Sequence, residues 1–293
     1  MTLGADVRRR IEVALGLSVV QTAEVRGGDI NHAHRLTLLD GTRAFVKTPR
    51  SACPGDLYAA EAAGLDALRD AADSAASVPG VLAVGDDFLV LEALRFGSPP
   101  PDFEERLGTA LAETHRASRG AARRFGFPCT TYLGRLMQNN QPTEPPHSWP
   151  TFWRDRRLLP LLEDLPAYPR LQTLGRRLAD RLDTLLDAPA EPPTLVHGDL
   201  WSGNAAFVSE ANRPALFDPA CGYTHREAEF GMTRLFGFGP RFEAAYHEAF
   251  PLADGWTRRV EVYRLHHLLS HAWHFGGGYA GQAEALLHQL LRP

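Results

Sequence analysis

The chain has 293 residues, of which 44% are hydrophobic and 23% charged, enough for one large or two modest domains with cores of their own. Its formal net charge of -4 gives no basic surface for nucleic acid or an anionic membrane, so we expect neither as a partner. No apolar run is long enough to cross a bilayer, and residues 1–10 lack the apolar segment of a secretory signal, so we expect a cytoplasmic protein.

The first part of the chain predicts an antiparallel sheet. An amphipathic segment at 6–15 comes first, and Asp40-Gly41 is typical of a hairpin turn. The strand-like runs lie at 19–25, 34–39, 43–48, 81–84 and 88–91. Residues 26–33 connect the first two runs and contain the glycine pair Gly27-Gly28. The backbone amides of this loop could close over phosphates, although a glycine pair between strands is more often a simple turn.

Lys47 is the only lysine in the chain and lies in apolar company between Val46 and Thr48. A strand lysine under a glycine loop is suited to holding phosphates if a carboxylate fixes it in place. Asp56 could cap a helix at 57–72, and Glu61 in its first turns is the candidate partner. The alternative is an ordinary solvated lysine at a strand end.

The composition changes at 95–101, where we predict a boundary between an N-terminal nucleotide-binding lobe (1–95) and a C-terminal helical lobe (96–293). Glu92-Ala93-Leu94 would be the hinge whose backbone meets adenine. Asp102 and Glu105 resemble a capping box at the start of a helix that runs to about residue 118. Further helices are expected at 150–162, 168–186, 226–236, 240–250, 257–275 and 280–291.

Residues 196–204 read Val-His-Gly-Asp-Leu-Trp-Ser-Gly-Asn. Asp199 and Asn204 have the spacing of a kinase catalytic loop, in which a carboxylate receives a hydroxyl proton and an amide oxygen binds a metal ion. Asp218 ends a short apolar run at 214–217, as a metal ligand at the end of a buried strand would. The alternative is an Asx-rich turn between two strands.

The sequence resembles the fructosamine kinase (ketosamine-3-kinase) family, a branch of the aminoglycoside and choline phosphotransferase group, over nearly the whole chain. The resemblance rests on Gly27-Gly28-x-Ile30-Asn31-x-Ala33, His197-Gly198-Asp199-Leu200-Trp201-x-Gly203-Asn204, Phe217-Asp218-Pro219-Ala220 and Tyr223-x-His225-Arg226-Glu227-Ala228. It implies an α+β, protein-kinase-like fold of two lobes, with a five-stranded antiparallel sheet in the N-lobe and a mainly helical C-lobe.

The resemblance also implies an ATP- and Mg²⁺-dependent kinase that phosphorylates the O3 hydroxyl of a small-molecule or protein-bound ketosamine, in a monomer or weak homodimer. Its implied catalytic base is Asp199, and its implied metal ligands are Asn204 and Asp218. The implied ATP-binding residues are Gly27, Gly28, Asn31, Lys47, Glu61, Glu92 and Leu94. Trp201 and His271 are implied to contact the substrate, with a core tryptophan and a packed or solvated histidine as the alternatives.

The sequence leaves some alternatives open and departs from the family pattern at two positions. The histidines at 266, 267, 271 and 274 could suggest a metal site, but no third ligand is evident. Glu229 stands where many family members have aspartate, and Asp29, which we predict to turn outward, replaces a glycine or cysteine. An aminoglycoside- or choline-type phosphotransferase of the same fold is the main alternative function. A non-catalytic binding module should have lost Lys47, Asp199, Asn204 or Asp218, and none is lost.

Overall fold

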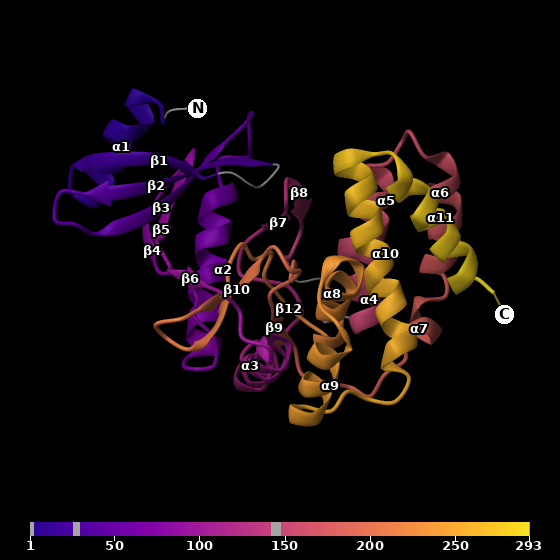
Figure 1. Cartoon of the computed structure of the whole chain (residues 1–293). Helices are drawn as coiled ribbons and strands as arrows, with labels where there is room; N and C mark the ends of the chain where they lie inside the picture. The colour runs from indigo at the N-terminus through magenta and orange to yellow at the C-terminus, as the bar shows by residue number, and fades with distance from the viewer. Residues whose placement is uncertain (1–2, 26–29, 142–147, 293) are drawn as a thin grey trace.

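The structure is a computed structural model, and it describes residues 3–25, 30–141 and 148–292 (Figure 1). A five-stranded antiparallel sheet in the order β1-β2-β3-β5-β4 forms the N-terminal part. Its strands are β1 (Val19–Val25), β2 (Asn31–Leu38), β3 (Arg43–Pro49), β4 (Val81–Gly85) and β5 (Phe88–Glu92). The predicted sheet is therefore confirmed, with β2 beginning three residues earlier than expected.

The sheet is covered on both faces by helices. Helix α1 (Ala5–Leu15) packs through Ile11 against a cluster that includes Val46, whereas α2 (Leu57–Ala72) packs on the other face. Because side chains alternate along a strand, Phe45 and Lys47 of β3 point to the face opposite that of Val46. This alternation directs the lysine toward α2.

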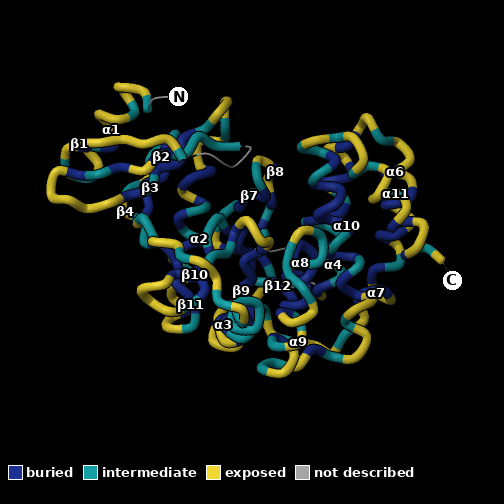
Figure 2. The backbone as a smooth tube through the Cα atoms, in the orientation of Figure 1, coloured by how far each residue is buried: buried dark blue, intermediate teal, exposed yellow. Residues whose placement is uncertain are grey.

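The C-terminal part is mainly helical. It contains α3 (Phe103–Ser118), α4 (Trp149–Trp153), the π-helical turn η1 (Arg154–Leu158), α5 (Leu159–Glu163), α6 (Pro169–Ala179), α7 (Leu182–Leu185), the 3-10 turn η2 (Arg226–Glu229), α8 (Phe230–Phe236), α9 (Pro240–Ala249), α10 (Trp256–Phe275) and α11 (Gly278–Leu290). Helix α10 packs against α8 and α11, and Figure 2 shows buried backbone where these helices meet. Within the described ranges, no helix has the length and apolar character needed to span a membrane.

Short strands position the loop at 197–204. β9 (Thr194–Val196) precedes this loop and pairs with β12 (Gly222–Thr224), while β10 (Ala205–Val208) follows it and pairs with β11 (Arg213–Leu216). β6 (Phe96–Gly97) extends the second pair from the predicted domain boundary, which itself stays a prediction. A separate hairpin of β7 (Thr131–Leu133) and β8 (Leu136–Gln138) had no counterpart in the predicted elements.

Two predicted helix caps are wrong. The Asp56 side chain does not cap α2 but accepts a hydrogen bond from Tyr132 Oη at 2.5 Å. Asp102 likewise makes no cap at α3, because its carboxylate accepts from Arg106 Nε at 2.8 Å. Each helix has the predicted position, but a longer-range or within-helix partner takes the carboxylate that a local pattern assigns to the cap.

Two predicted helices are interrupted. The segment predicted at 150–162 contains the π-helical turn, just before Pro160. Since proline has no N–H to offer the carbonyl group four residues earlier, Arg156 O accepts instead from Arg157 Nη1 at 3.0 Å. The segment predicted at 168–186 breaks after residue 179 into α6 and α7.

Candidate active site

A cavity of about 630 Å³ lies between the sheet and the helical part. The sheet contributes Phe45 and Lys47, and α2 contributes Glu61. The loop at 197–204 and the residues after β11 contribute the candidate catalytic groups. The lining also includes Asn31, Thr131, Leu133, Asp199, Trp201, Gly203, Asn204, Asp218, Met232, Phe236, His271, His274, Phe275 and Tyr279. The cavity thus brings together residues that are far apart in the sequence.

Lys47 is buried between two carboxylates. Its Nζ lies 2.6 Å from Glu61 Oε1 and 2.5 Å from Asp218 Oδ1. Burial alone would lower the pKa of Lys47, but the charges of Asp218 and Glu61 outweigh it and the net shift of the pKa is upward. The structure therefore brings together the predicted pair and adds Asp218 to it, so this lysine stays charged and points at the candidate metal ligand.

The backbone of the catalytic loop is shaped by His197 and Gly198. The Asp199 N–H donates to His197 Nδ1 at 3.3 Å, so His197 Nε2 carries the ring proton and donates to Phe217 O at 2.9 Å. Burial lowers the pKa of His197, which agrees with this neutral form. Gly198 has φ +80°, and a Cβ there would lie 2.2 Å from Ala220 O, so the position requires glycine.

Asp199 and Asn204 face each other in this loop. Asn204 Nδ2 donates to Asp199 O at 2.8 Å and to Asp199 Oδ2 at 3.2 Å, which leaves the amide oxygen as its group for a cation. Burial and then the charge of Asp218 raise the pKa of the Asp199 carboxyl well above its usual value. A carboxylate in such a setting is a better proton acceptor than one in water.

Glu229 anchors the catalytic loop from below. Its Oε2 accepts from His197 N at 2.6 Å, and its Oε1 accepts from Gly198 N at 3.0 Å. His115 Nε2 lies 3.4 Å from the same carboxylate. Glutamate thus holds two backbone N–H groups of the catalytic loop at a position where many family members have aspartate, despite its extra methylene group.

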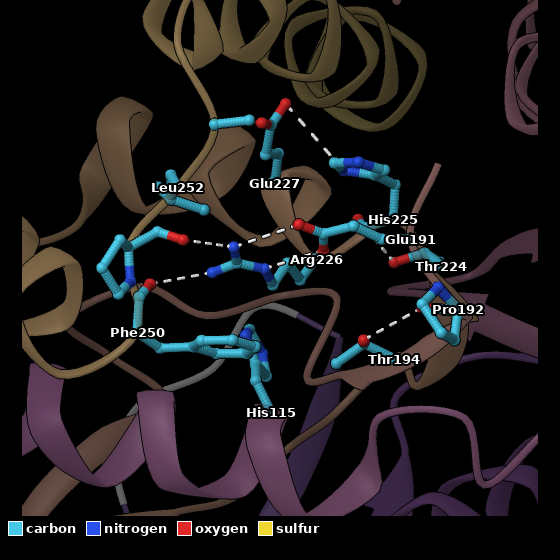
Figure 3. Close-up of polar contacts among 12 residues, drawn as sticks. His115, Glu191, Pro192, Thr194, Thr224, His225, Arg226, Glu227, Phe250 and Leu252 are labelled. Carbon is cyan, nitrogen blue, oxygen red and sulfur yellow. Dashed lines mark hydrogen bonds and ion pairs between the residues drawn. The ribbon is translucent and has the colours of Figure 1, made fainter. Parts of the chain in front are cut away.

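The neighbouring residues of η2 hold the turn in place. Arg226 is buried, donates from Nε to Glu191 Oε2 at 2.9 Å and from Nη1 to Phe250 O at 2.9 Å, as Figure 3 shows. Glu227 accepts two hydrogen bonds from Arg259, at 2.6 and 2.7 Å. The motif at 223–228 therefore has a structural role, because its Arg226 and Glu227 fix the turn that carries Glu229.

The side of the cavity away from Lys47 is aromatic. The indole of Trp201 is folded over Gly203, where an added Cβ would lie 2.3 Å from a ring atom. His271 has its ring centroid 5.0 Å from those of both Phe236 and Tyr279. Sequence reasoning found Trp201 and His271 but missed Phe236, Phe275 and Tyr279. Phe275 could have been found, because it lies four residues after His271 and so on the same helix face.

Some of the predicted nucleotide-binding residues do not line this cavity in the described part of the chain. Asn31 lines it and accepts from Tyr58 Oη at 2.9 Å, but Glu92 and Leu94 are absent from the described lining. Gly27, Gly28 and Asp29 lie outside the described residues, so their predicted contacts stay predictions. In the part of the chain that the structure describes, no group of three His, Cys, Asp or Glu residues is arranged to hold a metal ion.

Residues 6–293 match the model of the fructosamine kinase family. The chain belongs to the fructosamine kinase family. Among curated proteins, it is 34% identical to a chloroplastic protein-ribulosamine 3-kinase of Oryza sativa subsp. japonica, over 99% of this chain and 85% of that protein. The predicted family is thus confirmed, and the chain is a phosphotransferase that acts on a hydroxyl group.

Solved structures of fructosamine kinase relatives support the fold. A candidate fructosamine-3-kinase from Thermobifida fusca aligns with a TM-score of 0.85 and 34% identity, over 98% of this chain and 99% of that one. An aminoglycoside phosphotransferase APH(4)-Ia mutant, solved with ADP and hygromycin B, aligns with a TM-score of 0.60 at 16% identity, over 99% and 100% of the two chains. The predicted α+β, protein-kinase-like fold is therefore confirmed, and membership of a kinase family implies that ATP is used.

Proposed function

We propose that this fructosamine kinase family member transfers the γ-phosphoryl group of ATP to the O3 hydroxyl of a ketosamine. The observation that carries the proposal is one cavity in which Lys47, Asp199, Asn204 and Asp218 face a wall of aromatic side chains. Phosphoryl transfer requires mainly positioning and neutralisation of charge, and this set of groups supplies both. The protein-ribulosamine 3-kinase relative supports a sugar–amine adduct as the acceptor.

The nucleotide is held by the sheet side of the cavity. Lys47, fixed by Glu61, binds the phosphates of ATP, and Gly27, Gly28 and Asn31 close over them. Glu92 and Leu94 are proposed to contact the adenine ring of ATP through their backbone. The buried ion pair with Glu61 supports this role of Lys47, because it holds the ammonium group in position before the nucleotide binds.

Asn204 and Asp218 are the residues that would hold Mg²⁺. Their donors are an amide oxygen and a carboxylate, which are hard ligands of the kind that this ion prefers beside phosphates. When bound, the ion supplies charge neutralisation at the phosphate oxygens. Lys47 contacts Asp218 at 2.5 Å and so holds this carboxylate at the phosphate end of the cavity.

Asp199 is the proposed base. Its raised pKa and its contact with Asn204 suit a carboxylate that accepts the proton of the sugar hydroxyl as the phosphoryl group arrives. Trp201 offers an indole face to the C–H face of the sugar. His271 donates from Nδ1 to His267 O at 2.7 Å, so its Nε2 is an acceptor for a hydroxyl group of the substrate.

The test is release of ADP with Mg²⁺ and ATP in the presence of ribulose-lysine, fructose-lysine, kanamycin, choline or no acceptor. We expect turnover only with the two sugar–lysine adducts, and their kcat/KM values would rank the sugars. Turnover confined to kanamycin or choline would contradict the proposal and favour the aminoglycoside- or choline-type alternative. The cytoplasmic location and the monomeric or weakly dimeric state stay predictions.

A further inference from the structure

Four rings of the helical part form one continuous wall of the cavity. The centroid of His271 lies 5.0 Å from Phe236, 5.0 Å from Tyr279 and 5.7 Å from Phe275. Phe275 and Phe236 are 53% and 37% exposed, although large apolar side chains usually avoid water. We call Phe236, His271, Phe275 and Tyr279 the ring wall. Its exposed faces are available to a ligand.

The ring wall is close to the catalytic loop. Ser202, next to Trp201, donates from its backbone N–H and from Oγ to Phe236 O, at 3.4 and 3.1 Å. This tether places the end of α8 against the loop that carries Asp199. An acceptor whose hydroxyl group reaches Asp199 therefore has the ring wall within reach of its other end.

The ring wall carries no charge of its own. The Nδ1 atoms of His271 and His274 donate to the backbone oxygens of His267 and Ser270, and His274 Nε2 accepts from Arg135 N at 3.1 Å. Burial lowers the pKa of both histidines, so neither repels a cation at neutral pH. The nearby Arg135 guanidinium donates to Ser51 Oγ at 2.9 Å.

The carboxylates of the cavity are already engaged. In the described lining, only Glu61, Asp199 and Asp218 carry carboxylates. Glu61 and Asp218 both contact Lys47, and Asp199 accepts from Asn204. Each of these carboxylates thus already contacts Lys47 or Asn204, whereas Phe236 and Phe275 of the ring wall present exposed aromatic faces.

Resting on the proposed function, we infer that Phe236, Phe275 and Tyr279 bind the protonated secondary amine of the ketosamine through cation–π contacts, with its alkyl substituent lying along the ring wall. An alkylammonium is bound well by aromatic faces, because its charge is attracted to the ring and its carbon atoms are apolar. Such a wall suits one ammonium on an alkyl chain, and it would leave the several charges of an aminoglycoside uncompensated.

The test measures dissociation constants by calorimetry on the Mg²⁺-ADP form of the enzyme. The two ligands are 1-deoxy-1-butylamino-D-ribulose and its neutral ether analogue 1-O-butyl-D-ribulose. Asp199 and the nucleotide also attract a cation. The ratio of the two dissociation constants in the wild type therefore does not by itself show that the ring wall binds the ammonium group. The deciding variant is Phe275→Leu, which keeps an apolar side chain but removes the π face, with Phe275→Tyr as the matched control.

We expect Phe275→Leu to reduce the preference for the amine over the ether by roughly two- to fivefold, and Phe275→Tyr to keep it. Phe236→Leu should add to the loss, since Ser202 contacts its carbonyl group and not its ring. An equal weakening of both ligands, or no change in either, would overturn the inference while leaving the proposed function intact. Failure of the wild type to bind either ligand would instead count against the ketosamine as acceptor.

Discussion

Asp199 is the residue on which the proposed chemistry depends most. The change Asp199→Asn keeps the shape of the side chain but removes its ability to accept a proton. We expect kcat to fall by roughly 10²- to 10⁴-fold, while the affinity for nucleotide changes little, because Lys47 and Glu61 are untouched. Steady-state kinetics together with a nucleotide titration would check this. A variant that keeps a rate within about tenfold of wild type would show that another group is the base.

Gly203 controls where the neighbouring indole can lie. The change Gly203→Ala would place a Cβ 2.3 Å from the Trp201 ring and force the indole away. We expect the KM for the acceptor to rise by roughly three- to tenfold with the KM for ATP unchanged.

The control for Gly203 is a double-mutant cycle with Trp201→Ala. Once the indole is removed, Gly203→Ala should have almost no further effect on the acceptor KM. If the glycine change costs the same in both backgrounds, it acts through the loop backbone rather than through the position of Trp201.

At the scale of elements, the η2 turn supports the catalytic loop through one carboxylate. Glu229→Ala would leave one buried and one partly buried backbone N–H group without an acceptor, so we expect a loss of about 2–4 kcal/mol in the free energy of unfolding at pH 7. Glu229→Asp should lose less. Urea unfolding of the three proteins measures the difference, and equal stability of wild type and Glu229→Ala would contradict the role of this anchor.

The same carboxylate should give a pH dependence. Burial raises the pKa of Glu229, but its hydrogen bond from His115 and the nearby backbone donors outweigh this, and the net pKa is below its ordinary value of 4.5. A depressed folded-state pKa means that the stabilisation is present above the unfolded-state pKa and is lost as the pH falls through the folded-state one. The stability gap between wild type and Glu229→Ala should therefore shrink below about pH 4.5.

Helices and strands with a local hydrophobic periodicity or a turn signal could be predicted from the sequence. Features that depend on contacts between residues far apart in the chain could not. The helix at 57–72 and the five strands follow from periodicity and turn residues, and the alternation along β3 places Lys47 toward Glu61. The β7–β8 hairpin has three-residue strands, too short for a periodic signal. The ring wall depends on how α8, α10 and α11 pack, which no local window contains.

At the scale of the whole molecule, the two parts of the chain meet through Lys47 and Asp218. Lys47 comes from the sheet and Asp218 follows β11, so their contact forms only when the two sides of the cleft are together. We expect amine-reactive reagents to modify Lys47 slowly in the folded protein and rapidly after denaturation, because its side chain is only 6% exposed and paired twice.

Peptide mapping after labelling, with and without urea, measures this protection. Saturating nucleotide should slow the labelling of Lys47 further. Labelling in the native protein as fast as in urea would mean that the cleft opens widely and often in solution, and that the buried position is a minor part of its ensemble.

The buried position of the single lysine also affects how readily the protein itself is glycated by reducing sugars. Reducing sugars attack unprotonated, accessible amines, and the remaining basic side chains of this chain are arginines and histidines. The folded surface therefore offers no lysine to glycation in the described residues, and the one lysine side chain is held as an ammonium away from solvent. A kinase proposed to act on sugar–amine adducts would thus be a poor substrate for itself at lysine, and would become one only when it unfolds.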